Sequence, residues 1–464
     1  MTEKLTNFKK NDNLKEQRVL STGKAIIFTL PNMGLTAILA IAVFFTLLFY
    51  INIMGQPPII IGIIYSTTII VYAVFCIIWG VVADKIGKKK VLLFSGPILA
   101  ISFIFIWFPP PPTGSYGEIY LPLIIWLIFF GFVFRITIAG FQPIIYSLLP
   151  ELSTEEQNRI KISMVNMIMM ILGTVIGTIG PIVLMGDATK NLSREDPKLY
   201  YSSSIVGRII SDQIILFATL MSITFCICFI LMLLIIKEPP KQRKEKASFN
   251  DILKELAGPF KDKNYRLFLL TFYLFWIPFV AFQYLVLNLS TFVISMRGNE
   301  FILMAITVIL FSGFSFIGWK KLSEKFGLKE TLSICLIFAC ISFLLFFTLI
   351  IPMSNEIILV VGILLIAFCF CGMVGTMVFP FAIMSDLIDN AESKNSKKLS
   401  GSYSGAFIMM GSLAAATTLL IISFVLELFG PEASLGYIII LSILGSSLLF
   451  VAFIVFQKVQ LTNK

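Results

Sequence analysis

The chain is a succession of apolar runs, each long enough to cross a lipid bilayer as a helix. About 20 consecutive apolar residues span the hydrocarbon core, because a helix rises 1.5 Å per residue. We predict spans at residues 24–52, 58–82, 91–108, 121–148, 161–186, 212–236, 266–294, 299–319, 330–352, 355–383, 401–429 and 434–457. The alternating segments of about 10 residues that mark a membrane barrel are absent. The sequence therefore predicts an all-α polytopic membrane protein with twelve transmembrane helices.

The basic residues are distributed unevenly between the two sides of these spans. If the N-terminus is inside, the inner segments hold 30 of the 36 lysines and arginines. Basic residues mark the cytoplasmic side of a membrane protein. We therefore expect a multi-pass protein of the cytoplasmic (plasma) membrane with both termini in the cytoplasm. The net charge of +10 could suggest a nucleic-acid partner, but the basic residues lie in the loops of one side of the membrane. We therefore do not expect nucleic acid as a partner.

Two loops suggest that the chain is duplicated. Asp84-Lys-Ile-Gly87 follows the second span, and Glu324-Lys-Phe-Gly327 follows the eighth. Repeated halves are typical of secondary transporters, whose site lies between the repeats near the midplane. We predict two pseudo-symmetric six-helix bundles. The expected divisions are an N-tail (1–23), an N-terminal bundle (24–236), a cytoplasmic linker (237–265), a C-terminal bundle (266–457) and a C-tail (458–464).

The composition excludes several kinds of chemistry. The chain has no histidine, which removes imidazole relays and histidine-based metal sites. All seven cysteines fall inside apolar runs, where they are expected to pack as small hydrophobes. No nucleotide-binding Gly-x-x-x-x-Gly-Lys-Ser/Thr loop occurs. We expect no enzyme activity, no catalytic residue, no metal and no cofactor.

Three loops resemble those of known carriers. "GVVADKIGKKK" (80–90) resembles the signature loop of the major facilitator superfamily, although a basic turn on the cytoplasmic side would also account for it. "YSLLPELSTEEQNR" (146–159) and "FAIMSDLIDNAESKNSKKLSGSYS" (381–404) are similar to loops of the glycoside–pentoside–hexuronide:cation symporter family. The resemblance implies the major facilitator fold and a cytoplasmic gate of loop charges.

The gate and signature residues implied by the resemblance are Gly80, Asp84, Gly87, Lys88, Glu151, Arg159, Glu324, Gly327, Asp386, Asp389 and Glu392. The last three are spaced three apart, so they share one helix face independently of any family. The alternative for these acids is an ordinary solvated helix end.

The charged residues of that family's sugar and sodium site are missing here. The aligned positions carry Thr36, Tyr72, Cys76, Gln142, Asn166 and Gly411. Sodium is a hard cation that favours anionic oxygen ligands. We therefore do not expect sodium at the family's usual site. Proton coupling and uniport both stay open.

One charge, Arg135, lies inside a predicted span. A charged side chain at mid-membrane costs about 2.5 kcal/mol or more and is usually functional. Three roles are open: binding an anionic substrate group, binding backbone carbonyls as a structural element, and pairing with an acid brought near by the fold. Neutral candidates for substrate contacts are Asn32, Gln142, Tyr146, Asn166, Trp276, Gln283 and Asn288. Ordinary hydrogen bonding between helices is the alternative for each.

The combined features favour a secondary transporter that moves a sugar, glycoside or related small organic solute by alternating access. The alternatives are a carrier of a small organic anion or a lysolipid-like amphiphile whose charge binds Arg135, or a uniporter. A membrane sensor is the least favoured. The expected partners are a small-molecule substrate and membrane lipids, and the protein is expected to be a monomer.

Overall fold

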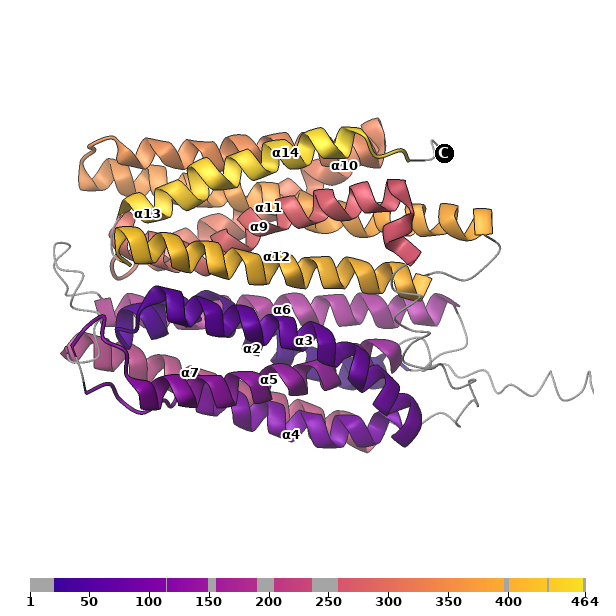
Figure 1. Ribbon diagram of the computed structural model, residues 1–464, viewed down its shortest axis with the longest axis horizontal. Helices are drawn as coiled ribbons and strands as arrows, with labels where there is room; N and C mark the ends of the chain where they lie inside the picture. Colours follow the sequence, from indigo (N-terminus) through magenta and orange to yellow (C-terminus); the bar gives the residue numbers. More distant parts are fainter. Residues whose placement is uncertain are drawn as a thin grey trace, which may run out of the picture.

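The computed structural model describes residues 21–113, 115–148, 156–189, 204–235, 258–395, 400–431 and 434–461. Long helices run along the molecule's longest axis, with the N-terminal half (indigo to magenta) beside the C-terminal half (orange to yellow; Figure 1). The first half contains α2 (Thr22–Leu47), η1 (Leu48–Ile53), α3 (Pro58–Ile86), α4 (Lys88–Ile106), α5 (Leu121–Leu148), α6 (Glu156–Thr189) and α7 (Ile205–Ile235). The second contains α9 (Lys263–Asn288), η4 (Leu289–Val293), α10 (Glu300–Leu344), η5 (Leu345–Ile350), α11 (Asn355–Asn395), α12 (Ser400–Phe429), α13 (Ser434–Ile438), η6 (Ile439–Gly445) and α14 (Ser446–Gln457).

The twelve predicted spans are present, although the described residues form eleven segments long and apolar enough to cross a membrane. The difference lies in α10, which joins two predicted spans, 299–319 and 330–352, across a kink. Gly327 at the kink has φ 82° and ψ 171°, a conformation that residues with a Cβ rarely adopt. Gly87, between α3 and α4, has φ 104° and ends the helix in the same way. The all-α fold of two six-helix halves is therefore confirmed.

Some helix ends differ from those predicted. The second span continues to Ile86 and the tenth to Asn395, well beyond residues 82 and 383. Polar residues extend these helices because a helix that leaves the bilayer can continue in water. The expected N-tail and linker lie largely outside the described residues, and so does the end of the C-tail, so the predicted domain boundaries stay predictions.

The two halves repeat one another in detail. Trp79 and Trp319 lie 240 residues apart, as Gly87 and Gly327 do. Each tryptophan Nε1 donates to a backbone carbonyl of another helix in its half: Trp79 of α3 to Ile136 of α5 at 2.9 Å, and Trp319 of α10 to Cys371 of α11 at 2.8 Å. Because α10 contains two of the predicted spans, the bonds join equivalent pairs of spans: the second to the fourth, and the eighth to the tenth. The duplication thus extends from the loops into the packing of each bundle.

The α2–α6 pair is packed through glycines. A Cβ on Gly173 would lie 2.0 Å from the Met33 carbonyl oxygen and 2.2 Å from Thr36 Oγ1. On Gly177 it would lie 2.4 Å from the Ala37 carbonyl oxygen. In lipid, helices associate through close van der Waals contact and hydrogen bonds, so small residues at the crossing are favoured.

The glycine contact leads to a stability prediction. Gly173→Ala should destabilise the folded protein by about 1–3 kcal/mol, because backbone atoms of α2 must move away. The matched control is Gly313→Ala on α10, where a Cβ meets nothing within 4 Å. Thermal melting of the detergent-purified protein should show a lowered Tm for the first variant alone. Equal Tm values for both variants would contradict this account of the α2–α6 contact.

Candidate functional site

The two halves meet where α2 packs against α9, α3 against α12 and α6 against α10. At the predicted outer end, Asn288 of α9 donates through Nδ2 to Asn52 Oδ1 of η1 at 2.8 Å. The same nitrogen lies 3.3 Å from the Tyr437 hydroxyl, and Asn52 Nδ2 lies 3.4 Å from the Pro431 carbonyl oxygen. We call these four residues the outer lock.

The α3–α12 contact closes the same end. Ser66 Oγ donates to the Ala416 carbonyl oxygen at 2.8 Å, and the Ile59 amide donates to Glu427 Oε2 at 3.1 Å. Gly62 allows the two helices to touch, because a Cβ there would lie 1.9 Å from Ser423 Oγ. These bonds again join one half to the other.

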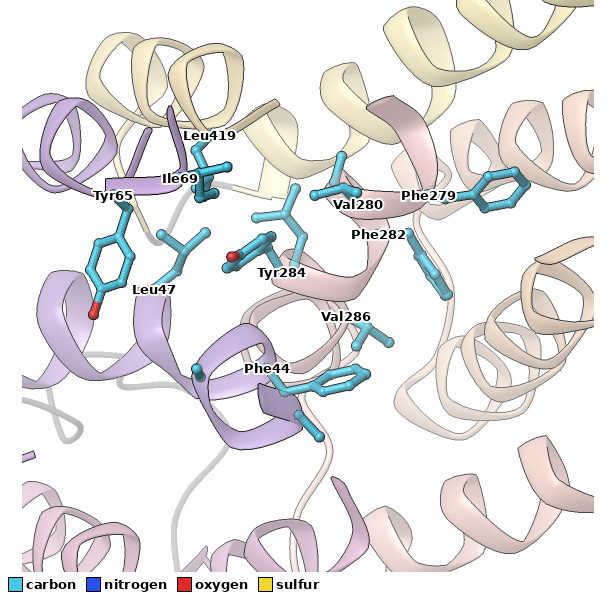
Figure 2. Close-up of a cluster of buried hydrophobic side chains, with 14 of the residues drawn as sticks. Phe44, Leu47, Tyr65, Ile69, Phe279, Val280, Phe282, Tyr284, Val286 and Leu419 are labelled. Carbon is cyan, nitrogen blue, oxygen red and sulfur yellow. The ribbon is translucent and has the colours of Figure 1, made fainter. Parts of the chain in front are cut away.

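Below the outer lock, apolar side chains from both halves fill the interface (Figure 2). We call this set the gate cluster: Phe44 and Leu47 from α2, Tyr65 and Ile69 from α3, Val280 and Tyr284 from α9, and Leu419 from α12. All are at most 8% exposed. Burial of these side chains away from water stabilises the contact between the two halves.

Arg135 lies in the middle of α5 and is half-buried. It lies close enough to Tyr284 of the opposite half and to Tyr65 of its own half for its charge to act on both phenols. Among the described residues, no aspartate or glutamate forms an ion pair with Arg135. Pairing with an acid therefore has no support in this part of the chain.

The positions aligned with the family's carboxylates come together as a neutral group. The Tyr72 hydroxyl donates to Gln142 Oε1 at 3.2 Å, and Cys76 interacts with the Tyr72 side chain. Both Tyr72 and Gln142 are half-buried. An amide and a phenol can exchange hydrogen bonds with hydroxyl groups but supply no anionic ligand for a metal ion.

The C-terminal half contributes an aromatic surface. Trp276 stacks on Phe272 with ring centroids 5.1 Å apart and planes inclined by 28°. Gly411, at the position aligned with a family lysine, faces both rings, because a Cβ there would lie 3.9 Å from Trp276 Nε1. Gln283 is half-buried and makes no hydrogen bond within the described part of the chain. The ring and the amide suit a ligand with one apolar face and several hydroxyls.

Three of the sequence candidates are engaged in packing. Asn32 donates to Asn166 between α2 and α6 of one half, and Asn166 Nδ2 also lies 3.5 Å from Met170 Sδ. Asn288 belongs to the outer lock. The side chain of Tyr146 lies outside the described residues. Sequence reasoning missed Tyr284 and Tyr65. A signal existed for Tyr284, which is one helical turn before Asn288 and so shares its face.

The predicted cytoplasmic gate is described in part. Asp386 and Glu392 are half-buried and Asp389 is exposed, while Leu387 and Ile388 beside them are buried, so the acids face away from the core. Glu324 pairs with Lys320 of its own helix at 4.0 Å, and both are largely exposed. Gly80 and Lys88 lie in α3 and α4. The side chains of Asp84, Glu151 and Arg159 lie outside the described residues, so the gate stays a prediction.

An apolar groove lies away from these groups. It has a volume of about 420 Å³ and lies between α10 and α11, lined by Phe311, Phe314, Trp319 and Phe368 among others. Phe314 is 72% exposed, as expected of a side chain that faces lipid tails. The Ser315 hydroxyl and the Trp319 indole N–H in its lining already donate to backbone carbonyls, so we do not take the groove as the candidate site.

Comparisons with known proteins agree with the architecture. The family model described as "MFS/sugar transport protein" matches residues 27–455. The D-xylose-proton symporter is 13% identical with a TM-score of 0.66, covering 94% of this chain and 98% of its own. The nucleoside transporter NupG is 14% identical with a TM-score of 0.63, covering 95% and 99%. The inward-open xylose transporter XylE from E. coli is 12% identical with a TM-score of 0.61, covering 95% and 96%. At these identities the structures show the fold alone. The comparison with curated protein sequences gave no match.

The outer lock leads to a conformational prediction. Spin labels at S115C and N355C, on exposed outer positions of the two halves, should report one short separation by pulsed electron resonance in a cysteine-replaced background. Asn288→Ala removes the bonds to Asn52 and Tyr437 and should add a longer-distance population. Each hydrogen bond contributes about 0.5–1.5 kcal/mol, so the loss of even one should shift the equilibrium by about 2- to 12-fold.

The matched control is Asn264→Ala, which breaks a 2.6 Å bond to the Gln460 carbonyl within one half. It should leave the distance distribution as in the parent protein. If Asn288→Ala also leaves the distribution unchanged, the outer lock does not hold the halves together.

Proposed function

Because the chain belongs to the MFS/sugar transport protein family, we propose that it moves a sugar, glycoside or related small organic solute across the cytoplasmic membrane by alternating access. The chain is a secondary transporter of the major facilitator fold and not an enzyme. The glycoside–pentoside–hexuronide:cation symporter family is the subdivision that its loops favour. The observation that carries the proposal is that each half offers neutral polar and aromatic groups, Tyr72 with Gln142 in one and Trp276 with Phe272 in the other, while the outer ends of the halves are in contact.

The proposed substrate contacts come from both halves. Tyr72 and Gln142 offer a phenol and an amide from the N-terminal half, joined by a 3.2 Å hydrogen bond. Trp276 and Gln283 offer an indole and an amide from the C-terminal half. Sugar hydroxyls can donate to and accept from amides, and the apolar face of a sugar ring can stack on an indole. The D-xylose-proton symporter and XylE, whose names refer to sugars, share this fold.

Alternating access would require the outer lock and the gate cluster to separate while contacts form at the other end. The acids on α11 and the basic loops are the proposed cytoplasmic counterpart. The xylose transporter XylE, described in an inward-open conformation, shares the fold. The closed outer end of this chain supports the same type of cycle.

We propose that the carrier does not use a sodium ion at the family's usual site. Tyr72, Cys76 and Gln142 occupy the positions of three carboxylates, and none of them can be an anionic oxygen ligand while keeping its usual protonation state. Uniport, or cotransport of a proton through an acid outside the membrane, remains compatible with this arrangement.

Uptake into proteoliposomes tests the proposal. A panel of radiolabelled sugars and glycosides should include at least one that accumulates inside or exchanges across the membrane, and an inward sodium gradient should not raise its rate. Failure of every sugar to enter would refute the proposed cargo. Stimulation by sodium would show that oxygen ligands other than the family's carboxylates form a cation site.

A variant pair locates the sugar contact. Gln142→Ala should raise the KM for the transported sugar by about 3- to 10-fold, because a hydrogen bond to a hydroxyl is worth about 0.5–1.5 kcal/mol. Gln213→Ala on α7, a glutamine of the same half outside the proposed site, is the control. An unchanged KM in the first variant would remove Gln142 from the site.

A further inference from the structure

The apolar groove between α10 and α11 has an aromatic wall. Its rings form a chain of edge-to-face contacts, with centroids 5.9 Å apart for Phe311–Phe368, 6.3 Å for Phe368–Phe338 and 5.7 Å for Phe338–Trp319. These rings come from three of the predicted spans, the eighth, ninth and tenth. Gly318 keeps the groove open, because a Cβ there would meet nothing within 4 Å. The surface therefore fits an apolar chain laid along the helices.

The groove has the length of one leaflet of a bilayer. Its lining residues on α10 run from Phe311 to Leu322, a rise of about 16 Å along the helix. The hydrocarbon core of a bilayer is about 30 Å thick, so each leaflet accounts for half of that depth. The eighth predicted span, 299–319, runs from the outside inward and has its midpoint close to Phe311. In this topology the groove lies in the cytoplasmic leaflet, with Leu322 at its cytoplasmic end.

Two lysines continue the groove face toward the cytoplasm. Lys321 follows Phe314 by seven residues and Lys325 follows Gly318 by seven, and residues seven apart lie on one side of a helix. Both lysines are exposed. They are also four residues apart, a spacing at which like charges repel each other. An anion bound between them would remove this repulsion.

Neighbouring side chains on α10 do not neutralise this pair. Within the described part of the chain, neither Lys321 nor Lys325 forms an ion pair. Lys325 Nζ lies 5.0 Å from the ring centre of Phe326, a contact that leaves its charge in place. The ion pair of this region, Lys320 with Glu324 at 4.0 Å, involves residues directly preceding the two lysines, and adjacent residues point to different sides of a helix.

The acids of α11 lie nearer the cytoplasm than the lysine pair. Trp319 donates to the Cys371 carbonyl at 2.8 Å, which places these two residues at one level of the membrane. The eighth and tenth spans run in the same direction, so Lys325 is level with roughly residue 377 of α11. Asp386 lies nine residues further on, a rise of about 14 Å. The cytoplasmic mouth of the groove is therefore positively charged.

We propose that an anionic phospholipid of the cytoplasmic leaflet binds here, with one acyl chain in the groove and its phosphate between Lys321 and Lys325. Anionic lipids of that leaflet attract basic residues close to the membrane surface. The aromatic wall supplies the contact for the chain, the lysines supply the charge, and the spacing between them matches the depth of one leaflet. The inference does not depend on which solute the carrier moves.

The N-terminal half has different residues at the equivalent positions. The repeat offset of 240 residues that relates Trp79 to Trp319 also relates Ile78 to Gly318 and Val81 to Lys321. An isoleucine would fill the groove where Gly318 leaves it open, and a valine would remove one of the two charges. The duplication thus supplies two substitutions that should remove the site, Gly318→Ile and Lys321→Val.

Quenching of Trp319 fluorescence by brominated phospholipids measures occupancy of the groove. The full-length carrier, with its other four tryptophans replaced by phenylalanine, is reconstituted in mixtures of phosphatidylcholine and phosphatidylglycerol, and each lipid is brominated in turn. A lysine near the membrane surface contributes about a fivefold preference for anionic lipid. Brominated phosphatidylglycerol should therefore bind beside Trp319 about 5- to 25-fold more tightly than brominated phosphatidylcholine.

The variants separate the charge from the groove. Lys321→Val should lower the preference for phosphatidylglycerol by about fivefold, and Lys321→Gln with Lys325→Gln should abolish it. Gly318→Ile should reduce quenching by both lipids. The controls are Lys320→Gln and Gly313→Ile on the same helix, outside the groove lining, where a Cβ on Gly313 meets nothing within 4 Å. Both controls should behave like the parent protein.

Three results would overturn the proposal. Equal quenching by the two lipids in the parent protein would show that the lysines select no anionic lipid. Quenching by neither lipid would show that protein covers the groove. A loss of preference in Lys320→Gln as large as in the double lysine variant would show a general effect of surface charge.

A melting experiment on the carrier with all its tryptophans gives a second readout. A ligand that binds only the folded protein raises its Tm. Phosphatidylglycerol added to the detergent-purified carrier should raise the Tm of the parent protein and of Lys320→Gln, and should raise that of the double lysine variant much less. An equal rise in all three proteins would contradict binding at Lys321 and Lys325.

Discussion

The contact of α9 with the N-terminal half is the interaction on which the arrangement of the interface depends. Asn288 of α9 reaches Asn52 at 2.8 Å, and one turn earlier Tyr284 lies close to Arg135. Single hydrogen bonds of this kind are weak in membrane proteins, at about 0.6 kcal/mol on average. These bonds lie beside the gate cluster, to which both halves contribute. The contact of α9 with the N-terminal half therefore extends from the outer lock to Arg135.

The proposed transport cycle requires this contact to form and to break. Between helices of one half, lipid and glycine-mediated packing favour close association throughout, as at Gly173 of α6. Between halves, the separated state is solvated by water, so polar bonds exchange with water at little net cost. Tryptophan-to-carbonyl bonds are found within each bundle, at Trp79 and Trp319, whereas the amide pair Asn52–Asn288 joins the two bundles.

The sequence allowed the fold to be predicted well because each span is specified locally. Apolar run length gives the helices, and the loops at Gly87 and Gly327 reveal the duplication. The prediction that Arg135 is the exceptional residue also follows from one span alone.

The partners of the polar side chains could not be predicted from the sequence. Asn52 and Asn288 are 236 residues apart, and only the packing of the two halves brings them together. Asn32 and Asn166 were equally plausible as ligands by residue type, and their mutual bond within one half is a result of helix register. The sequence does contain a signal for the two tryptophans. Trp79 and Trp319 each precede the acid of the repeated loop by five residues, and in the structure each donates a hydrogen bond to another helix of its half.

The central claim is that the outer contact between the halves must open in every transport cycle. The most direct measurement joins that contact covalently and records transport. In a cysteine-replaced background, N52C/N288C is linked with a short bis-methanethiosulfonate, which forms a reducible disulfide with each thiol, and N32C/N166C, an asparagine pair within one half, is the matched control. The account predicts that linking the first pair stops uptake, that reduction restores it, and that linking the second pair leaves uptake in place. Full uptake by carriers linked through positions 52 and 288 would contradict it.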